Sequence, residues 1–161
     1  MCALQSPGAL AVVAESKAAV CLMHMQGTPQ TMQAAPHYED VVGEVGAFLQ
    51  ARAAACLAAG LAADRIALDP GFGFGKGLAH NLQLLAGLPQ LAAGRFPLLV
   101  GLSRKSMLGK LLGRPVEQRL AGSLALATIA VMHGARIVRC HDVAETCDAV
   151  AVAWAARTGA D

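Results

Sequence analysis

Apolar residues along the chain alternate between short continuous runs and longer stretches with helical spacing. The continuous runs lie at residues 18–25, 66–69, 96–103 and 135–140, and they do not alternate strictly between apolar and polar positions. Runs of this kind are typical of parallel strands that are covered on both faces. We therefore predict four parallel strands.

Each predicted strand is followed by a stretch in which apolar residues recur every three or four positions, which predicts a helix. The four stripes are Val41, Val45, Phe48, Leu49, Cys56 and Leu57; Leu78, Leu82 and Leu85; Leu120, Leu124, Ala127 and Val131; and Val143, Cys147, Val150 and Trp154. Gly60 is expected to end the first of these helices. Asp142 with Glu145 predicts a capping box at the start of the last.

The first residues and the overall order complete the predicted architecture. Ser6 followed by Pro7 predicts the start of a short helix that runs to about Ser16. After it, strand, loop and helix follow one another four times, which is an α/β arrangement. The pattern fits an open doubly wound sheet and part of an eight-stranded barrel equally well.

Composition narrows the class of protein. A chain of 161 residues with 55% hydrophobic residues can bury the core of one domain. The net charge of +2 comes with scattered basic residues, so we expect no nucleic-acid partner. The apolar run 120–132 is too short to span a bilayer, and the N-terminus lacks the basic region of a signal peptide, so we expect a cytoplasmic protein without a membrane partner.

The five cysteines contain no CxxC pair and mostly lie in apolar stretches. We interpret Cys2, Cys21, Cys56, Cys140 and Cys147 as buried, reduced thiols, not as a zinc or disulfide framework.

The stretch DPGFGFGKG, residues 69–77, is not one of the known phosphate-binding loops. A Walker A loop would need glycine at Pro70 and Ser or Thr at Gly77. A dinucleotide fingerprint that starts at Gly71 would need glycine at Lys76. The stretch is therefore a glycine-rich loop that follows a carboxylate at the end of a strand.

The unusual polar residues gather at the carboxyl ends of the four predicted strands, where both candidate architectures hold their active sites. They are Met23 and His24, Asp69, Ser103 to Ser106, and Arg139 to His141.

Simpler explanations exist for several of these residues. Asp69 before Pro70 also fits a turn, and His24 between two methionines fits a packed histidine. Arg104 and Lys105 fit the solvated start of a helix, although a helix N-terminus disfavours cations. Arg139 among apolar neighbours predicts a buried guanidinium that needs an anionic or aromatic partner.

The segments CLMHMQGTPQTMQ, DPGFGFGK, VGLSRKSMLG, RLAGSLA and RCHD together resemble the dihydropteroate synthases of folate biosynthesis, in order and spacing. The resemblance extends over residues 1–161 as one partial domain. It implies a (β/α)8 TIM barrel, of which this chain would be the C-terminal half with strands five to eight.

The resemblance also implies an activity. The family condenses a pterin that carries a methyl diphosphate, 6-hydroxymethyl-7,8-dihydropterin diphosphate, with para-aminobenzoate, giving 7,8-dihydropteroate and pyrophosphate. The alternatives are a non-catalytic pterin-binding remnant and the related pterin-dependent methyltransferases, although SRKSMLG with RCHD fits the synthases better.

Roles for individual residues follow from the resemblance. Asp69 would bind the amide-and-amine edge of the pterin and Lys105 its ring oxygen and nitrogen, while Met23 forms an apolar wall. Arg139 would stack on the pterin and, with His141, contact the diphosphate. Phe74 and Ser106 would form the aminobenzoate pocket, and Lys105, Arg139 and His141 are the expected catalytic residues.

Magnesium is the implied cofactor, but its main protein ligand belongs to a TPDSFSDGG-type loop with no counterpart in these residues. We therefore expect no metal ligand here, no activity of this chain alone, and a homodimer for a full-length protein.

Overall fold

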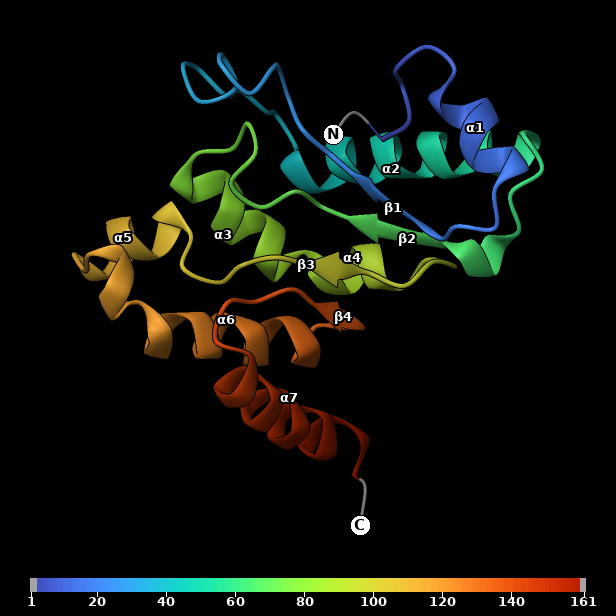
Figure 1. The fold of residues 1–161 in the computed structure, drawn as a ribbon. Helices are drawn as coiled ribbons and strands as arrows, with labels where there is room; N and C mark the ends of the chain where they lie inside the picture. The colour runs from blue at the N-terminus through green and yellow to red at the C-terminus, as the bar shows by residue number, and fades with distance from the viewer. Residues whose placement is uncertain (1–2, 160–161) are drawn as a thin grey trace.

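The computed structural model describes residues 3–159, in which helices and four short strands alternate (Figure 1). The strands are β1 (Val20–Met23), β2 (Ile66–Asp69), β3 (Leu99–Val100) and β4 (Ile137–Val138). The helices are α1 (Ala9–Glu15), α2 (Val41–Ala58), α3 (Leu78–Ala86), α4 (Leu88–Ala92), α5 (Ser106–Leu112), α6 (Leu120–Met132) and α7 (Val143–Thr158), with 3-10 turns at Ala63–Arg65 and Val116–Gln118. The predicted α/β alternation is confirmed.

The four strands lie side by side in chain order and are parallel. β1 pairs with β2 in a register that sets Met23 opposite Asp69, and β3 pairs with β4. A parallel bridge between Leu68 and Leu98 joins the two pairs. Within residues 3–159, β1 and β4 each pair on one side only, so both outer strands keep an open edge.

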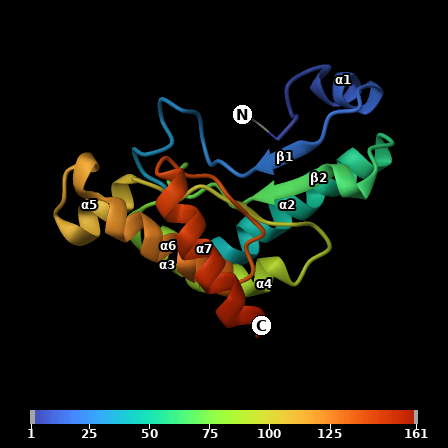
Figure 2. The same ribbon diagram turned by 60° about the horizontal axis from the view of Figure 1, so that its bottom comes forward.

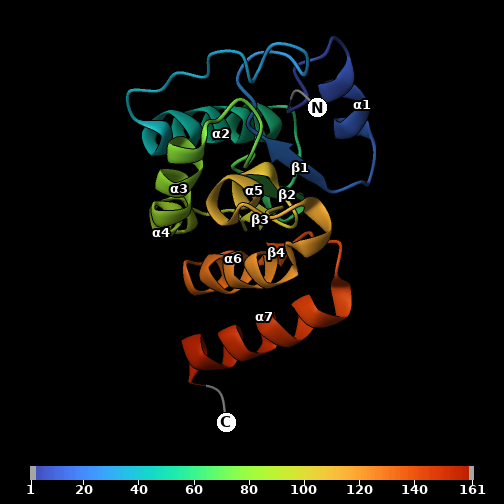
Figure 3. The same ribbon diagram turned by 90° about the vertical axis from the view of Figure 1, so that its left-hand side faces the viewer.

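The helices follow one another in an arc along the strands, as Figure 3 shows for α2, α3, α6 and α7. Helix α2 contacts α3 and α4, α5 contacts α3 and α6, and α6 contacts α7. Helix α2 also contacts β1 and β2. The core between these layers is formed by large side chains such as Leu22, Phe72, Leu84 and Leu98. In Figure 2 the arrowheads of β1 and β2 point toward the end of the molecule where α5 lies.

Helix α2 is long and apolar enough to cross a membrane by length and composition. Its buried residues Val41, Val45, Leu49, Ala53 and Cys56 form one stripe that faces the core, with strands β1 and β2 among its neighbours. Asp40 caps it, because the Asp40 carboxylate accepts hydrogen bonds from the backbone N–H of Val42 and Gly43. We interpret α2 as the core helix that the sequence predicts.

Several predicted boundaries are wrong. Helix α1 begins at Ala9 after Gly8, whose φ of 77° ends the preceding turn, so Ser6 is not its cap. The segment RKSMLG is not all loop, because α5 starts at Ser106. Strands β3 and β4 keep only two residues each of the longer apolar runs.

Helix stripes and cysteines also differ from prediction. In α3 the buried residues include Asn81 and Leu84, while Leu82 is exposed. In α7 the buried residues are Thr146 and Ala153. Of the four described cysteines only Cys56 is buried, and Cys2 lies outside the described residues.

Candidate functional site

Asp69 ends β2 and is buried, with 5% of its surface exposed. Its Oδ1 accepts a hydrogen bond of 2.8 Å from the N–H of Gly71, so the turn suggested by the sequence is present. Burial raises the pKa of the Asp69 carboxyl, while the Gly71 N–H and the cations of Lys105, Arg139 and Lys76 act in the opposite direction. Asp69 is thus a buried acid among three cations.

Lys105 reaches across from the loop before α5 to the glycine-rich loop after β2. Its Nζ donates to the carbonyl of Phe72 and lies 4.6 Å from the centre of the Phe74 ring. Burial lowers the pKa of Lys105 to about 8, against the attraction of Asp69. The predicted neighbours Asp69, Phe74 and Lys105 are therefore brought together.

Arg139 follows β4 and is exposed, so the predicted buried guanidinium is wrong. Strand β4 is an outer strand of two residues, and no further strand within residues 3–159 covers its open side. The guanidinium lies against Gly101, where a methyl group would come within 2.4 Å of Nη2. Gly101 therefore leaves the space that Arg139 occupies.

His141 is held by Ser103, which was predicted only as one of the polar residues at the end of a strand. Ser103 is buried, and its Oγ lies 3.0 Å from Nδ1 of His141. The same Oγ accepts a hydrogen bond of 3.2 Å from the backbone N–H of His141. A cavity of about 330 Å³ is lined by Gly101, Ser103, Arg104, Lys105, Val116, Arg139 and His141. Three cations and a histidine thus border one small polar cavity.

Arg104 and Asp142 form an ion pair, with Arg104 Nε donating to Asp142 Oδ2 at 3.0 Å. The bond from Arg104 lowers the pKa of Asp142. Asp142 does occupy the N-cap of α7, but its side chain caps no backbone N–H, so the predicted capping box is wrong. Its carboxylate instead joins the loop after β3 to the start of α7.

The backbone of Arg104 is held in a left-handed conformation, with φ of 56°. Its N–H donates to Ser123 Oγ at 2.9 Å, and its carbonyl accepts from Arg119 Nη1 at 3.0 Å. Arg119 and Ser123 belong to the segment RLAGSLA, and the sequence predicted no role for either residue. They shape the loop that presents Lys105.

Two predicted residues have weaker connections to this cluster. Ser106 is exposed at the first turn of α5 and Met23 is half-buried at the end of β1. His24 is buried, as the simpler explanation held, and hydrogen-bonds with Lys76.

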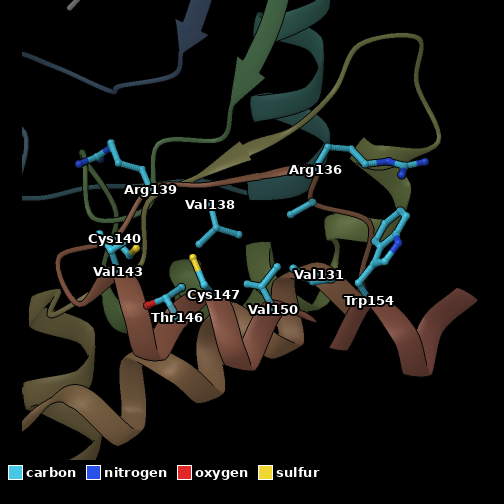
Figure 4. Close-up of a pocket in the computed structure, with 11 residues that line it drawn as sticks. Val131, Arg136, Val138, Arg139, Cys140, Val143, Thr146, Cys147, Val150 and Trp154 are labelled. Carbon is cyan, nitrogen blue, oxygen red and sulfur yellow. The ribbon is translucent and has the colours of Figure 1, made fainter. Parts of the chain in front are cut away.

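A larger, mostly apolar cavity of about 680 Å³ lies between β4 and α7 (Figure 4). Val138, Val143, Cys147, Val150 and Trp154 line it, with Arg139 near one end and Arg136 near the other. The apolar stripe that was predicted to be the buried face of α7 thus faces this crevice, and Arg139 lines both the crevice and the polar cavity.

No group of three or more His, Cys, Asp or Glu within residues 3–159 gathers in a way that could hold a metal ion. The buried carboxylate at the strand ends, Asp69, is surrounded by cations, which disfavours a divalent metal there. These residues do not fit a magnesium site.

Comparison with known proteins identifies the class. Residues 2–141 match the model of the family described as pterin binding enzyme. The chain therefore belongs to the pterin binding enzymes, and the α/β architecture found here is of the TIM-barrel type of that family.

Within this family the chain is similar to dihydropteroate synthases, which confirms the resemblance found in the sequence. It is 54% identical to that of Escherichia coli K12 over 149 residues, which is 92% of this chain and 53% of the relative. It is 52% identical to that of Haemophilus influenzae over 98% of this chain and 57% of the relative. The chain thus spans about half the length of the curated relatives it matches.

Solved structures give the same result. A Yersinia pestis dihydropteroate synthase with a sulfonamide drug matches 97% of this chain and 57% of its own chain, at a TM-score of 0.93 and 52% identity. A Xanthomonas albilineans dihydropteroate synthase in complex with 7,8-dihydropteroate matches the same shares at a TM-score of 0.88 and 49% identity.

Proposed function

We propose that this chain forms the pterin-binding and aminobenzoate-binding part of a dihydropteroate synthase. The observation that carries the proposal is a buried carboxylate, Asp69, at the carboxyl end of β2 with Lys105 and Arg139 as neighbouring cations. The relatives that are 52% to 54% identical are named synthases, which favours this activity over that of the pterin-dependent methyltransferases.

Asp69 would accept two parallel hydrogen bonds from the amide-and-amine edge of a pterin. Such a pair is specific because both donors lie in one plane, and each charged hydrogen bond contributes about 1.5 to 3 kcal/mol. Lys105 would donate to the ring oxygen and nitrogen of the pterin, and Met23 would pack against the ring.

Arg139 and His141 would bind the diphosphate. The planar guanidinium can stack on the pterin and still direct donors at phosphate oxygens, which a lysine cannot do. His141, held through Ser103, supplies a second contact to the anion. Both would stabilise the charge that the leaving pyrophosphate gains as its bond to the methylene carbon breaks.

The aminobenzoate would lie beside Phe74 and Ser106, with its amine directed at that methylene carbon. The contribution of these side chains is to position the two substrates, and no covalent nucleophile is required. Lys105, between Phe74 and Asp69, would contact both parts of the site.

We also propose that the four strand–helix units are strands five to eight of a (β/α)8 barrel. Four parallel strands in chain order, and a match to 53% of the length of the relative, support this arrangement. In this proposal the ligands of Mg²⁺ belong to the other half of the barrel, and this chain alone is inactive.

We also propose that the full-length protein is a homodimer. We place it in the cytoplasm, where the exposed thiols of Cys21 and Cys147 would stay reduced.

The proposal is tested by calorimetry with a pterin pyrophosphate analogue, on a chain extended by the first half of the Escherichia coli relative. Asp69→Asn replaces a charged pair of hydrogen bonds by a mismatched neutral one, so affinity should fall about tenfold or more. Asp64→Asn, just before the other end of the same strand, is the matched control and should bind normally. Equal affinity of the Asp69→Asn variant and the unchanged protein would remove Asp69 from the site.

A further inference from the structure

Lys76 is a buried cation whose hydrogen bonds are all made inside the protein. It closes the glycine-rich loop and has 3% of its surface exposed. Its Nζ lies 2.9 Å from His24 Nδ1, 3.0 Å from the carbonyl of Gly71 and 3.1 Å from the carbonyl of Phe74. An ammonium has three donors, so these three partners use all of them.

The hydrogen bond between Lys76 and His24 determines the tautomer of the His24 ring. Burial lowers the pKa of Lys76 to about 7, so below that pH Lys76 is an ammonium. An ammonium cannot accept a hydrogen bond, so His24 Nδ1 is then the acceptor and the ring proton lies on Nε2. The ring is packed edge-on against Phe48 at 5.0 Å and lies 6.1 Å from the ring of Tyr38. Burial and the charge of Lys76 lower the pKa of His24 to about 4, so the ring is neutral near pH 7.

The same lysine joins two loops whose backbones touch. A methyl group on Gly71 would lie 1.8 Å from the carbonyl oxygen of His24, and one on Gly75 would lie 2.5 Å from that of Gln26. The hydroxyl of Tyr38 donates to the carbonyl of Gly75 at 2.8 Å. The loop after β1 and the loop after β2 therefore fit together as one unit around Lys76.

The turn that Lys76 holds also carries the contacts of Lys105. The N–H of Phe74 donates to the carbonyl of Gly71 at 3.1 Å, and Lys76 binds the carbonyls of both residues. The carbonyl of Phe72, which lies between Gly71 and Phe74 in the chain, accepts a hydrogen bond from the Lys105 ammonium. The Phe74 ring also lies against the Lys105 ammonium. A change in this turn would therefore move two partners of Lys105 together.

We propose that Lys76 is a positioning residue that, through a neutral His24, fixes the loop presenting Phe74 and the Phe72 carbonyl to Lys105. Lys76 itself does not touch substrate in this proposal. The effect of Lys76 on catalysis rests on the proposed function, whereas the tautomer of His24 and the rigidity of the loop do not depend on it.

A dependence on pH follows from the geometry. The charged groups around Lys76 are Asp69 and Lys105, and His24 faces Lys76 and the phenol of Tyr38. Protonated His24 would have no acceptor at Nδ1, so Lys76 would lose a partner and face a second cation. Because the pKa of His24 is depressed in the closed loop, the contribution of His24 to closure is complete above its ordinary pKa of about 6.5 and is lost as the pH falls toward 4.

The test uses ¹⁵N-histidine NMR on the ligand-free chain, with the His24 signals assigned from a His24→Gln variant. We expect the Nε2–H tautomer between pH 6 and pH 5, where Lys76 is an ammonium and His24 is neutral. In Lys76→Met the titration of His24 should move upward toward 6.5, and amides of residues 70–77 should exchange with solvent about tenfold faster or more. Lys110→Met, an exposed lysine in α5, is the matched control and should change neither.

A second variant keeps the test decisive if Lys76→Met does not fold. His24→Gln retains an acceptor for Lys76, so its loop should stay protected and lose the pH dependence between 6.5 and 4, whereas His24→Leu should open the loop at every pH. Mixed tautomers in the unchanged protein between pH 6 and pH 5, or loop exchange in His24→Leu equal to that of the unchanged protein, would overturn the proposal. Since no ligand is present, failure of the pterin assignment would leave these results unaffected.

Discussion

At the scale of single residues, Arg139 is exposed, and its guanidinium group is both positively charged and planar. It packs on Gly101 beside the polar cavity and contributes an attraction to Asp69. A lysine would keep the charge but would lose the planar fork and the stacking surface.

Arg139→Lys should therefore lower turnover severely, about a hundredfold or more, in the extended chain that completes the barrel. Arg136→Lys is the control, because Arg136 lies at the other end of the crevice against Trp154 (Figure 4). Pyrophosphate release measures both variants. Near-normal turnover of Arg139→Lys would show that Arg139 has a structural role only.

The sequence located most of the candidate residues because the carboxyl ends of parallel strands meet at one edge, so residues distant in sequence become neighbours. Asp69 and Lys105 follow this rule. The roles of Ser103 and Ser123 were not predicted, since a serine in a loop gives no sign of the partner that its hydroxyl will bind. The exposure of Arg139 depends on which strand lies next to β4, and no local pattern contains that information.

At the scale of elements, the site depends on close contact between the loops after β1 and β2. Gly71 has a φ of 71° and leaves no room for a side chain next to His24. Gly113 ends α5 with a φ of 64° but faces open space. The two glycines share a backbone conformation and differ in surroundings.

Gly113→Ala should cost about 1 to 2 kcal/mol of stability, the usual cost of a left-handed residue with a side chain. Gly71→Ala adds a steric clash with backbone, so it should cost more than about 3 kcal/mol or open the loop. Chemical denaturation of both variants measures the difference. Equal losses would mean that the two loops do not touch as described.

Helix periodicity predicted α2, and a continuous apolar run predicted β2, with almost their observed bounds. The stripes predicted for α3 and α7 differ from the faces that are buried. Strands β3 and β4 are shorter than their apolar runs because pairing, which requires a neighbour, ends before the apolar composition does. The Asp142 side chain leaves the helix cap for Arg104, a partner 38 residues away in sequence, so local capping signals could not predict it.

At the scale of the whole molecule, β1 and β4 have no partner on their outer side among residues 3–159, and the crevice between β4 and α7 is lined by apolar side chains. Open strand edges and exposed apolar faces favour association between chains. The chain alone should therefore self-associate.

Val150→Lys places a charge in the crevice and should shift the chain toward monomer in analytical ultracentrifugation. Val152→Lys adds the same charge to an exposed position of α7 outside the crevice and should change association less. If the two variants behave alike, the crevice is not the associating surface.

The loops that follow β1, β2, β3 and β4 are proposed to form one half of a synthase site. The most direct measurement is pyrophosphate release that depends on para-aminobenzoate, for the chain alone and for the chain joined to the first half of the Escherichia coli relative, with Asp69→Ala in each. We predict turnover only for the joined protein, lost with Asp69→Ala. Turnover by a monodisperse monomer of the chain alone, absent from its Asp69→Ala variant, would contradict the proposal that the chain is half of a barrel. Equal turnover of the joined protein with and without Asp69→Ala would contradict the assignment of the site.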